Sequence, residues 1–152
     1  AGTLTADLRA NFNDHKIKKI KRDSVSPADV YDFENQVPEN RATLTLSYQT
    51  DGMFSGYVRL NHYGSWGDSG GQIAASDASE AVSYGAEILV DIEAALQLND
   101  NFRVAIGGEN VFDTYPGADG HFVAGLLGIQ YALTSPFGFN GAFWYGRLVA
   151  EF

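Results

Sequence analysis

The chain has 152 residues, a formal net charge of -9 and no cysteine. The acidic balance argues against a nucleic-acid partner, and the lack of cysteine excludes disulfides and thiolate metal sites. No run reaches the roughly 18 apolar residues that a membrane-spanning helix needs. Mean hydropathy is -0.16, which does not exclude a transmembrane barrel, because only every second residue of its strands faces lipid. The first residues show neither an initiator Met nor a signal segment, so we expect the chain to begin inside a longer protein.

Apolar and polar residues alternate along six segments, which indicates β-strands. The segments are 4–12, 41–48, 54–61, 84–98, 102–107 and 144–152. The clearest is 84–98, where the even positions are all apolar or aromatic and the odd positions carry Glu87, Asp91 and Glu93. As a helix, the same residues would wrap the apolar set around the axis. Most of these runs approach the 9–11 residues of a tilted membrane-crossing strand rather than the 5–6 of soluble strands.

Short and long connections alternate between these segments. Asp51-Gly52 and Asn99-Asp100 read as tight turns, and Asp-Gly is a strong hairpin signal. The long connections cover about residues 14–40, 64–82 and 113–141. This pattern predicts antiparallel hairpins with all long loops on one side, as in outer-membrane barrels. We expect no helix of substantial length.

The two faces of the predicted strands differ in chemistry. The odd positions hold charges of both signs, whereas the even positions are apolar. In a barrel, these faces would line the lumen and contact lipid, respectively. Alternation alone leaves a second interpretation open, in which the polar face is the solvent side of a soluble β-sandwich.

Several motifs in the sequence resemble those of TonB-dependent outer-membrane receptors. Residues 108–116 (GENVFDTYP) and 135–148 (SPFGFNGAFWYGRL) are similar to two stretches near the end of that family. Residues 37–41 (VPENR) are similar to its entry into a late strand. The terminal Phe152, with Leu148 and Ala150 at alternate positions before it, resembles the outer-membrane assembly signal. The chain departs from the family at Val111, where Leu is usual, and at Ala150, where an aromatic is frequent.

The resemblance implies an all-β fold: an antiparallel up-and-down transmembrane β-barrel segment, with about the last six strands of a 22-stranded barrel in residues 1–152. The family's plug domain would then be absent, together with the segment that contacts TonB. The implied function is TonB-coupled uptake of a scarce, bulky solute across the bacterial outer membrane, with iron–siderophore as the default. The implied partners are outer-membrane lipid and lipopolysaccharide, the outer-membrane assembly machinery, and a small-molecule ligand. Residues 122–131 look strand-like, but the resemblance places them in the last extracellular loop.

Loop aromatics are the candidates for ligand contact, because they can stack on a siderophore or a sugar: Tyr63, Trp66, Tyr115 and Phe122. The basic run from Lys16 to Arg22 is interpreted either as a contact for lipopolysaccharide or another anion, or as a solvated loop. We expect no catalytic residue, cofactor or metal site. The three histidines lack metal-ligand spacing, and we interpret the carboxylates at 87, 91 and 93 as lumen lining. The alternatives are a small structural or adhesive outer-membrane barrel and a soluble β-sandwich binding module.

Overall fold

The computed structural model describes residues 1–21, 25–71 and 75–151. In chain order the elements are β1 (Gly2–Phe12), α1 (Pro27–Asn35), β2 (Asn40–Thr50), β3 (Phe54–Tyr63), β4 (Trp66–Asp68), β5 (Val82–Tyr84), β6 (Glu87–Gln97), β7 (Phe102–Glu109), α2 (Phe122–Leu127) and β8 (Phe143–Ala150). Neither helix has the length and apolarity needed to cross a membrane, a finding that covers the described residues. The protein is therefore mostly antiparallel β-sheet, as the alternation predicts.

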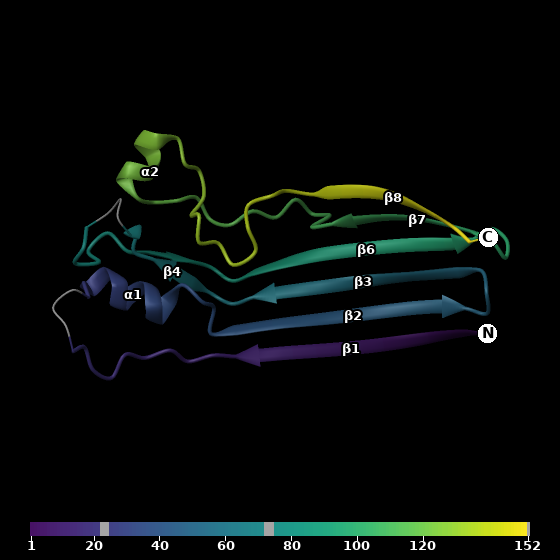
Figure 1. Cartoon of the computed structure of the whole chain (residues 1–152), viewed down its shortest axis with the longest axis horizontal. Helices are drawn as coiled ribbons and strands as arrows, with labels where there is room; N and C mark the ends of the chain where they lie inside the picture. Colours follow the sequence, from purple (N-terminus) through teal and green to yellow (C-terminus); the bar gives the residue numbers. More distant parts are fainter. Residues whose placement is uncertain (22–24, 72–74, 152) are drawn as a thin grey trace.

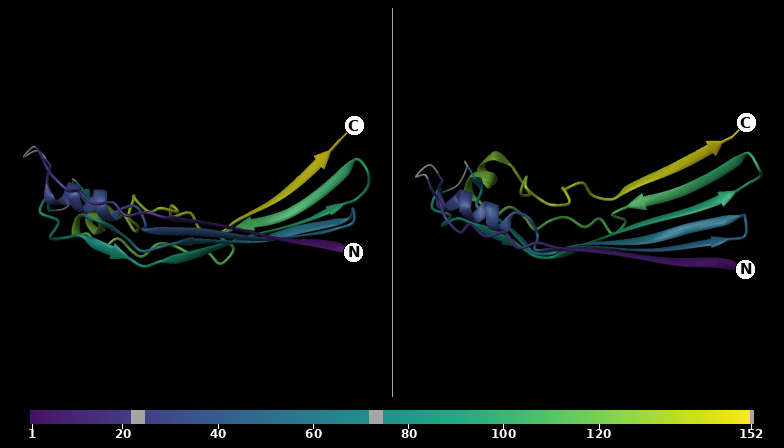
Figure 2. Two further views of the ribbon diagram at one scale, coloured as in Figure 1. Left: turned by 90° about the horizontal axis from the view of Figure 1, so that it is seen from below. Right: turned by 60° about the horizontal axis from the view of Figure 1, so that its bottom comes forward.

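Six long strands form one sheet in the order β1-β2-β3-β6-β7-β8, and β4 and β5 form a separate two-stranded sheet. Every neighbouring pair in the large sheet is antiparallel. The sheet is open rather than closed into a barrel: within the described ranges, β1 pairs only with β2 and β8 only with β7. Figure 2 shows that the sheet is curved, with β7 and β8 rising out of the plane of β1, β2 and β3.

The register keeps even residues beside even residues across the whole sheet. One such row runs from Leu8 through Leu44 and Leu60 to Val90. Because successive side chains of a strand point to opposite faces, all even residues share one face. The alternation within each strand therefore extends across all six strands. This confirms the two predicted faces as the two opposite sides of one sheet.

The even face is apolar, and we call it the apolar face. Along the six strands it carries no charged residue. Its polar members lie at strand ends, where His62 Nε2 and Asn40 Oδ1 are 2.9 Å apart at one end and Thr50 lies at the other. Its large side chains are exposed, with Leu8 at 71% and Phe12 at 80%. The strand charges all lie at odd positions, on what we call the polar face.

Both predicted tight turns are confirmed, and they lie at the same end of the sheet (Figure 1). Between β2 and β3, the Thr50 hydroxyl accepts a hydrogen bond from the Phe54 amide (2.9 Å), and Gly52 adopts a φ of 96° that suits glycine. Between β6 and β7, Asn99 Oδ1 accepts the amides of Asn101 and Phe102, each at 3.0 Å. The three long connections lie at the opposite end, as predicted.

The expectation of no helix is wrong for the first long connection. Helix α1 begins with a capping box, in which the Ser26 hydroxyl accepts the Asp29 amide and the Asp29 carboxylate accepts the Ser26 amide. Pro27 follows the cap, at a position where its missing N–H costs nothing. The Ser-Pro-x-Asp sequence is therefore a local helix start within a connection otherwise read as loop.

One strand boundary differs from the sequence prediction. The segment 84–98 is not one strand: Tyr84 ends β5, and β6 begins at Glu87. Residues 122–127 lie in the connection between β7 and β8, as the resemblance implies, and there they form the short helix α2. The left-handed Gly128 (φ 70°) ends α2, because glycine tolerates that conformation best.

The two open edges and the exposed apolar face predict how the isolated chain behaves. Each unsatisfied backbone group in hydrocarbon costs several kcal/mol, and an open edge pairs with other strands. We expect residues 1–152 alone in water to aggregate or to require detergent, as measured by sedimentation velocity with and without detergent. A monodisperse monomer with a cooperative thermal transition in plain buffer would contradict this.

Candidate functional site

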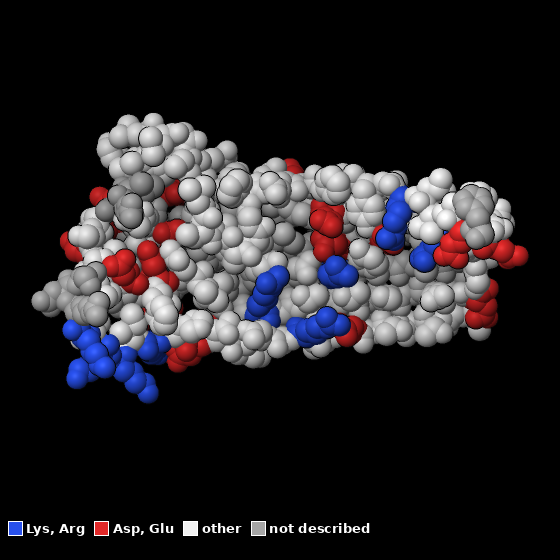
Figure 3. Space-filling model, in the orientation of Figure 1, with Lys and Arg blue, Asp and Glu red and all other residues white. Residues whose placement is uncertain are grey.

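The polar face is concave. Figure 2 shows β7 and β8 curling toward the side from which Figure 3 views the molecule, and Figure 3 shows acidic and basic side chains across the middle of that side. The charges therefore lie inside the curve of the sheet, and the apolar face lies outside it. This arrangement makes the polar face the candidate inner surface.

Glu93 is the centre of the strongest contacts on the polar face. Arg147 Nη2 donates to Glu93 Oε1 at 2.7 Å and to Oε2 at 2.9 Å. The Tyr145 hydroxyl donates to Glu93 Oε2 at 2.7 Å. The Glu93 side chain is only 10% exposed, and charge-assisted hydrogen bonds of this kind compensate for the burial of a carboxylate.

Small residues on β7 make this contact possible. Glu93 lies beside Gly107, and Gly107 lies beside Tyr145, so the hydroxyl must reach across β7. A Cβ at Gly107 would lie 2.5 Å from Tyr145 Cζ and 2.9 Å from the Ile92 carbonyl oxygen. Glycine at 107 therefore lets the Tyr145 ring lie flat over the strand.

A second polar chain links β2, β3 and β6 to the end of β7. Thr43 Oγ1 donates to Asn61 Oδ1 (3.3 Å), and Asn61 Nδ2 donates to Asp91 Oδ2 (2.7 Å). The other oxygen of Asp91 accepts the backbone N–H of Asn110 at 3.0 Å. The sheet and the last long connection are thus joined through one carboxylate.

Three arginines of the polar face have no carboxylate partner among the described residues: Arg41, Arg59 and Arg103. Arg41 donates to the Tyr63 hydroxyl (2.9 Å), Arg59 to Thr45 Oγ1 (3.4 Å) and Arg103 to Ser55 Oγ (2.7 Å). Arg59 also lines an open hollow of about 540 Å³ with polar neighbours on β1 and β2. These cations are available to an acidic or polar surface placed inside the curve.

The 108–116 motif forms a corner between β7 and β8. Asn110 is buried and left-handed (φ 49°), a conformation that asparagine tolerates better than most residues. Its side chain accepts the Thr114 amide (3.0 Å) and donates to the Thr114 carbonyl (2.8 Å). Asp113 Oδ1 accepts the Ala142 amide (2.8 Å). These two side chains of the motif therefore satisfy backbone groups that no strand partner reaches.

Tyr115 completes this corner. Its hydroxyl bonds to the Asp113 carboxylate, and this bond is the first cause that raises the pKa of Tyr115 above its usual value. Both side chains lie where a Cβ at Gly141 would be, so glycine at 141 is required for the close approach. The two resembling motifs, 108–116 and 135–148, thus meet in space.

The long connections pack into an ordered layer beyond the strand ends. The Asp32 carboxylate on α1 accepts both the amide and the hydroxyl of Ser69, each at 2.7 Å. Asp68, at the end of β4, accepts the hydroxyl of Thr134 from the third connection. All three connections are therefore tied by carboxylate hydrogen bonds, in which Asp68 and Ser69 are buried, Asp32 is half-buried and Thr134 is exposed.

The small core of the loop layer is aromatic. Trp66 stacks on Tyr84 with ring centroids 4.2 Å apart and Ala132 beside them. Burial, followed by the charges of Asp119 and Asp68, raises the pKa of Tyr84 well above its usual value. The Tyr84 hydroxyl and His121 Nε2 are buried with no hydrogen-bond partner among the residues that the structure describes, whereas His121 Nδ1 lies 2.5 Å from Asp119 Oδ1.

The four predicted ligand contacts fall into two groups. Tyr63 and Trp66 are buried: Tyr63 packs on Phe137 (centroids 5.1 Å) and Trp66 belongs to the loop core. Tyr115 is 37% exposed and stacks on Tyr131, and Phe122 is 74% exposed on α2. The four side chains do not form one exposed cluster, because Tyr63 and Trp66 are buried in packing contacts.

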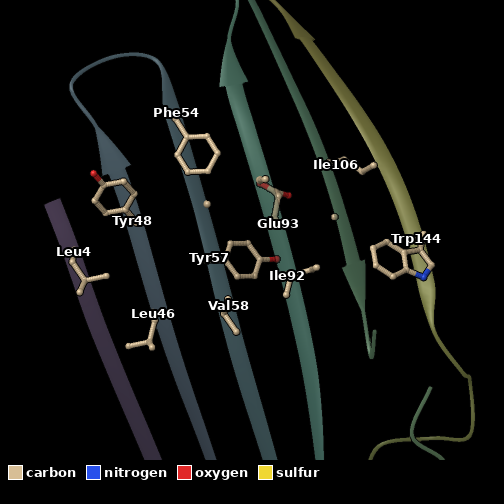
Figure 4. Close-up of a pocket in the computed structure, with 13 residues that line it drawn as sticks. Leu4, Leu46, Tyr48, Phe54, Tyr57, Val58, Ile92, Glu93, Ile106 and Trp144 are labelled. Carbon is tan, nitrogen blue, oxygen red and sulfur yellow. The ribbon is translucent and has the colours of Figure 1, made fainter. Parts of the chain in front are cut away.

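The proposed assembly residues Leu148 and Ala150 lie at even positions of β8, on the exposed apolar face. Phe152 and Arg22 lie outside the described residues. The apolar face also has a shallow hollow of about 510 Å³ where Gly56 and Ala94 pair, bounded by larger side chains such as Tyr48, Phe54 and Trp144 (Figure 4). Small residues in the middle of an apolar row produce this hollow.

Sequence reasoning missed several residues that position the loops, namely Asp32, Asp68, Ser69 and Thr134. Their partners are far apart in the chain and carry no local spacing signal. The sequence predicted one part of the Glu93–Tyr145–Arg147 contact: all three residues have odd numbers and therefore lie on the same face of the sheet. Within the described residues no group of three potential ligand side chains suits a metal ion.

The fit of Tyr145 over Gly107 predicts a sharp steric effect. Gly107→Val would displace the ring from Glu93 and press on the backbone of β6, with a cost of about 1–3 kcal/mol. Gly85→Val is the matched control, because nothing lies within 4 Å of the Cβ position at Gly85. Unfolding by urea in detergent would measure the stability of both variants. Equal stabilities of the two variants would contradict the role assigned to Gly107.

Comparisons with known proteins give one informative likeness. No family model and no curated protein matches the chain. Among solved structures, a point mutant of the ferric enterobactin receptor PfeA from Pseudomonas aeruginosa superposes with a TM-score of 0.57 at 19% identity. The match covers 76% of this chain and 16% of the receptor chain. The chain thus shares the fold of a section of that receptor and spans a small part of its length.

Proposed function

We propose that this chain is the closing section of the barrel of a TonB-dependent outer-membrane receptor that takes up a scarce, bulky solute, by default a ferric siderophore. The observation that carries the proposal is the separation of charge. Six strands in continuous register place every strand charge on the concave face and none on the convex face. A transmembrane barrel requires this distribution, with lipid outside and a polar lumen inside. The fold likeness to a ferric enterobactin receptor supports the same proposal.

The apolar face would contact lipid. Its polar residues lie at strand ends. This fits a hydrocarbon band bounded by Asn40 and His62 at the extracellular surface and by Thr50 at the periplasmic surface. Between Gly2 and Phe12 the strand rises about 33 Å along its own axis. At a tilt of roughly 40° this length crosses about 25 Å, which is the height of the apolar band of outer-membrane barrels. We also propose that Leu148, Ala150 and Phe152 present the chain to the assembly machinery, and that lipopolysaccharide surrounds the outer rim.

The polar face would enclose a plug domain encoded upstream, through which TonB acts. Arg41, Arg59 and Arg103 support this role, because they present donors toward the concave side without a described carboxylate partner. A plug surface with acidic or carbonyl groups would complete their hydrogen bonding. No step of this function requires catalysis or a resident cofactor, and we propose neither.

The loop layer would form part of the ligand entrance. Its ordered packing gives exposed side chains a fixed position, which lowers the entropy cost of binding. Phe122 and Tyr115 are the proposed ligand contacts, since both retain exposed ring surface. Tyr63 and Trp66 would act through packing, by holding strand ends and loops in place.

A structural or adhesive outer-membrane barrel is the second candidate. It is favoured by the apolar surface of the last connection, where Phe122, Leu126 and Leu127 are each more than 60% exposed, a kind of patch that marks interaction sites. The soluble sandwich is less consistent with the structure, because no second sheet covers the apolar face among the described residues.

Substitution of two neighbouring residues at nearly the same depth in the bilayer tests which face of the sheet contacts lipid. Val90 is even and Leu89 is odd, so their side chains lie on opposite faces of β6. Val90→Arg should cost roughly 2–4 kcal/mol if the residue lies near the bilayer midplane, whereas Leu89→Arg should cost less, because it faces the polar side. Folding into lipid vesicles across a urea series would measure both. Equal costs would contradict the proposed membrane orientation.

Uptake itself is tested in the organism that carries the gene. Deletion should abolish energised uptake of at least one labelled ferric siderophore, and a protonophore should abolish the same uptake in the parent strain. Phe122→Ala should weaken ligand affinity about two- to tenfold. Leu127→Ala is the matched control on the same helix. Unchanged uptake of all tested siderophores, cobalamin and oligosaccharides after deletion would contradict the receptor function.

A further inference from the structure

All the lysines of the protein lie in one short stretch. The sequence has ten basic residues, and its lysines are Lys16, Lys18, Lys19 and Lys21. The arginines other than Arg22 lie at odd strand positions on the polar face. In a chain of net charge -9, the stretch 16–21 is therefore a separate cationic surface, and we call it the lysine stretch.

The backbone of the lysine stretch is held while its ammonium groups are exposed. The Ile17 amide donates to Glu34 Oε1 on α1 (2.8 Å), and the His15 ring packs edge-on against Phe33. His15 and Ile17 are half-buried, whereas all four lysines are exposed. The chain thus lies against α1 with the cations directed outward.

These cations are also poorly neutralised within the protein. Lys16 lies 3.6 Å from Asp14, and both side chains are at least 70% exposed. The other three lysines form no ion pair with a described residue. A surface ion pair as exposed as that of Lys16 contributes little, so the stretch retains a net positive field.

The position of the stretch fits the headgroup zone of a membrane. It follows β1, whose outermost apolar-face residue is Phe12. Lys16 comes four residues later and Lys19 seven, at most about 14 and 25 Å along the chain, and the polar zone lies just outside the hydrocarbon core. Figure 3 shows the basic side chains gathered at one corner of the loop end, beside the strand β1 edge.

We propose that the lysine stretch binds the phosphate groups of a glycolipid headgroup in the outer leaflet, with the chemistry of lipid A. The inference rests on the proposed outer-membrane location and deepens it by assigning the residues. Lysine presents three rotatable donors and a compact charge, which suits several phosphate geometries. Exposed lysines beside the hydrocarbon boundary would lie closer to lipid phosphates than to a soluble anion bound deeper in the lumen.

The test uses the full protein that carries this chain, reconstituted in bilayer discs of phosphatidylethanolamine with or without lipid A. The variant is Lys18→Gln/Lys19→Gln. The matched control is Gln130→Glu/Asn140→Asp, which lowers the net charge equally from exposed positions in the last connection. A second control replaces the same two lysines by arginine. Lipid A retained per protein is measured by mass spectrometry, with urea stability as the folding check.

Each basic residue near an anionic surface strengthens binding by roughly fivefold, so the glutamine variant should bind lipid A about 25-fold more weakly. The loop control and the arginine variant should change it little. An equal loss in the loop control, or binding of inorganic phosphate as tight as that of lipid A, would overturn the assignment. Ferric-siderophore uptake by the same variants reads out the receptor function separately, so failure of one proposal is distinguishable from failure of the other.

Discussion

The register of the six-stranded sheet is the constraint on which the rest depends. Because the side-chain period is two, a slip of one residue between any two strands would move a whole apolar row onto the polar face. A slip of β6 or β8 against β7 would also separate Glu93 from Tyr145, since their contact requires both to align with Gly107. The tight turns at 51–53 and 98–101 fix two of the five pairings locally. The other pairings depend on the match of apolar rows and on polar contacts across strands.

The polar contacts carry the same register into the loops. Asp91 accepts from Asn61 on β3 and from the Asn110 backbone at the end of β7, so one carboxylate positions the first residue of the corner. Asn110 and Asp113 then bind backbone groups on both sides of the last connection. A loop that begins from a fixed corner can pack against the other loops, and the carboxylates of Asp32 and Asp68 complete that packing.

The sequence predicted what local patterns encode. Strand positions, faces and turns follow from alternation and from Asp-Gly or Asn-Asp, which act over a few residues. Helix α1 was also encoded locally, in Ser26-Pro27-Ala28-Asp29, and was overlooked because it lies in a connection between strands. The β4–β5 pair and the Asp32–Ser69 contact were not readable, since each joins residues that are distant in the sequence. The sequence does not show whether an aromatic side chain near a strand end is buried or exposed. For this reason Tyr63 and Trp66 were predicted as ligand contacts, although both are buried.

The two cationic residue types occupy different environments for a physical reason. Arginines on the polar face hold a fixed planar array of donors against hydroxyls or a carboxylate, as Arg147 does with Glu93 and Arg103 with Ser55. Such contacts order the inner surface without strict charge balance. Lysines at 16–21 have flexible stems and strongly hydrated heads, which suit a wet surface whose anions vary in position. Arg147→Lys would preserve the net charge but would lose the planar guanidinium whose Nη2 contacts both oxygens of Glu93. The exchange of Lys18 or Lys19 for arginine would keep the exposed charge on which contact with a variable anionic surface depends.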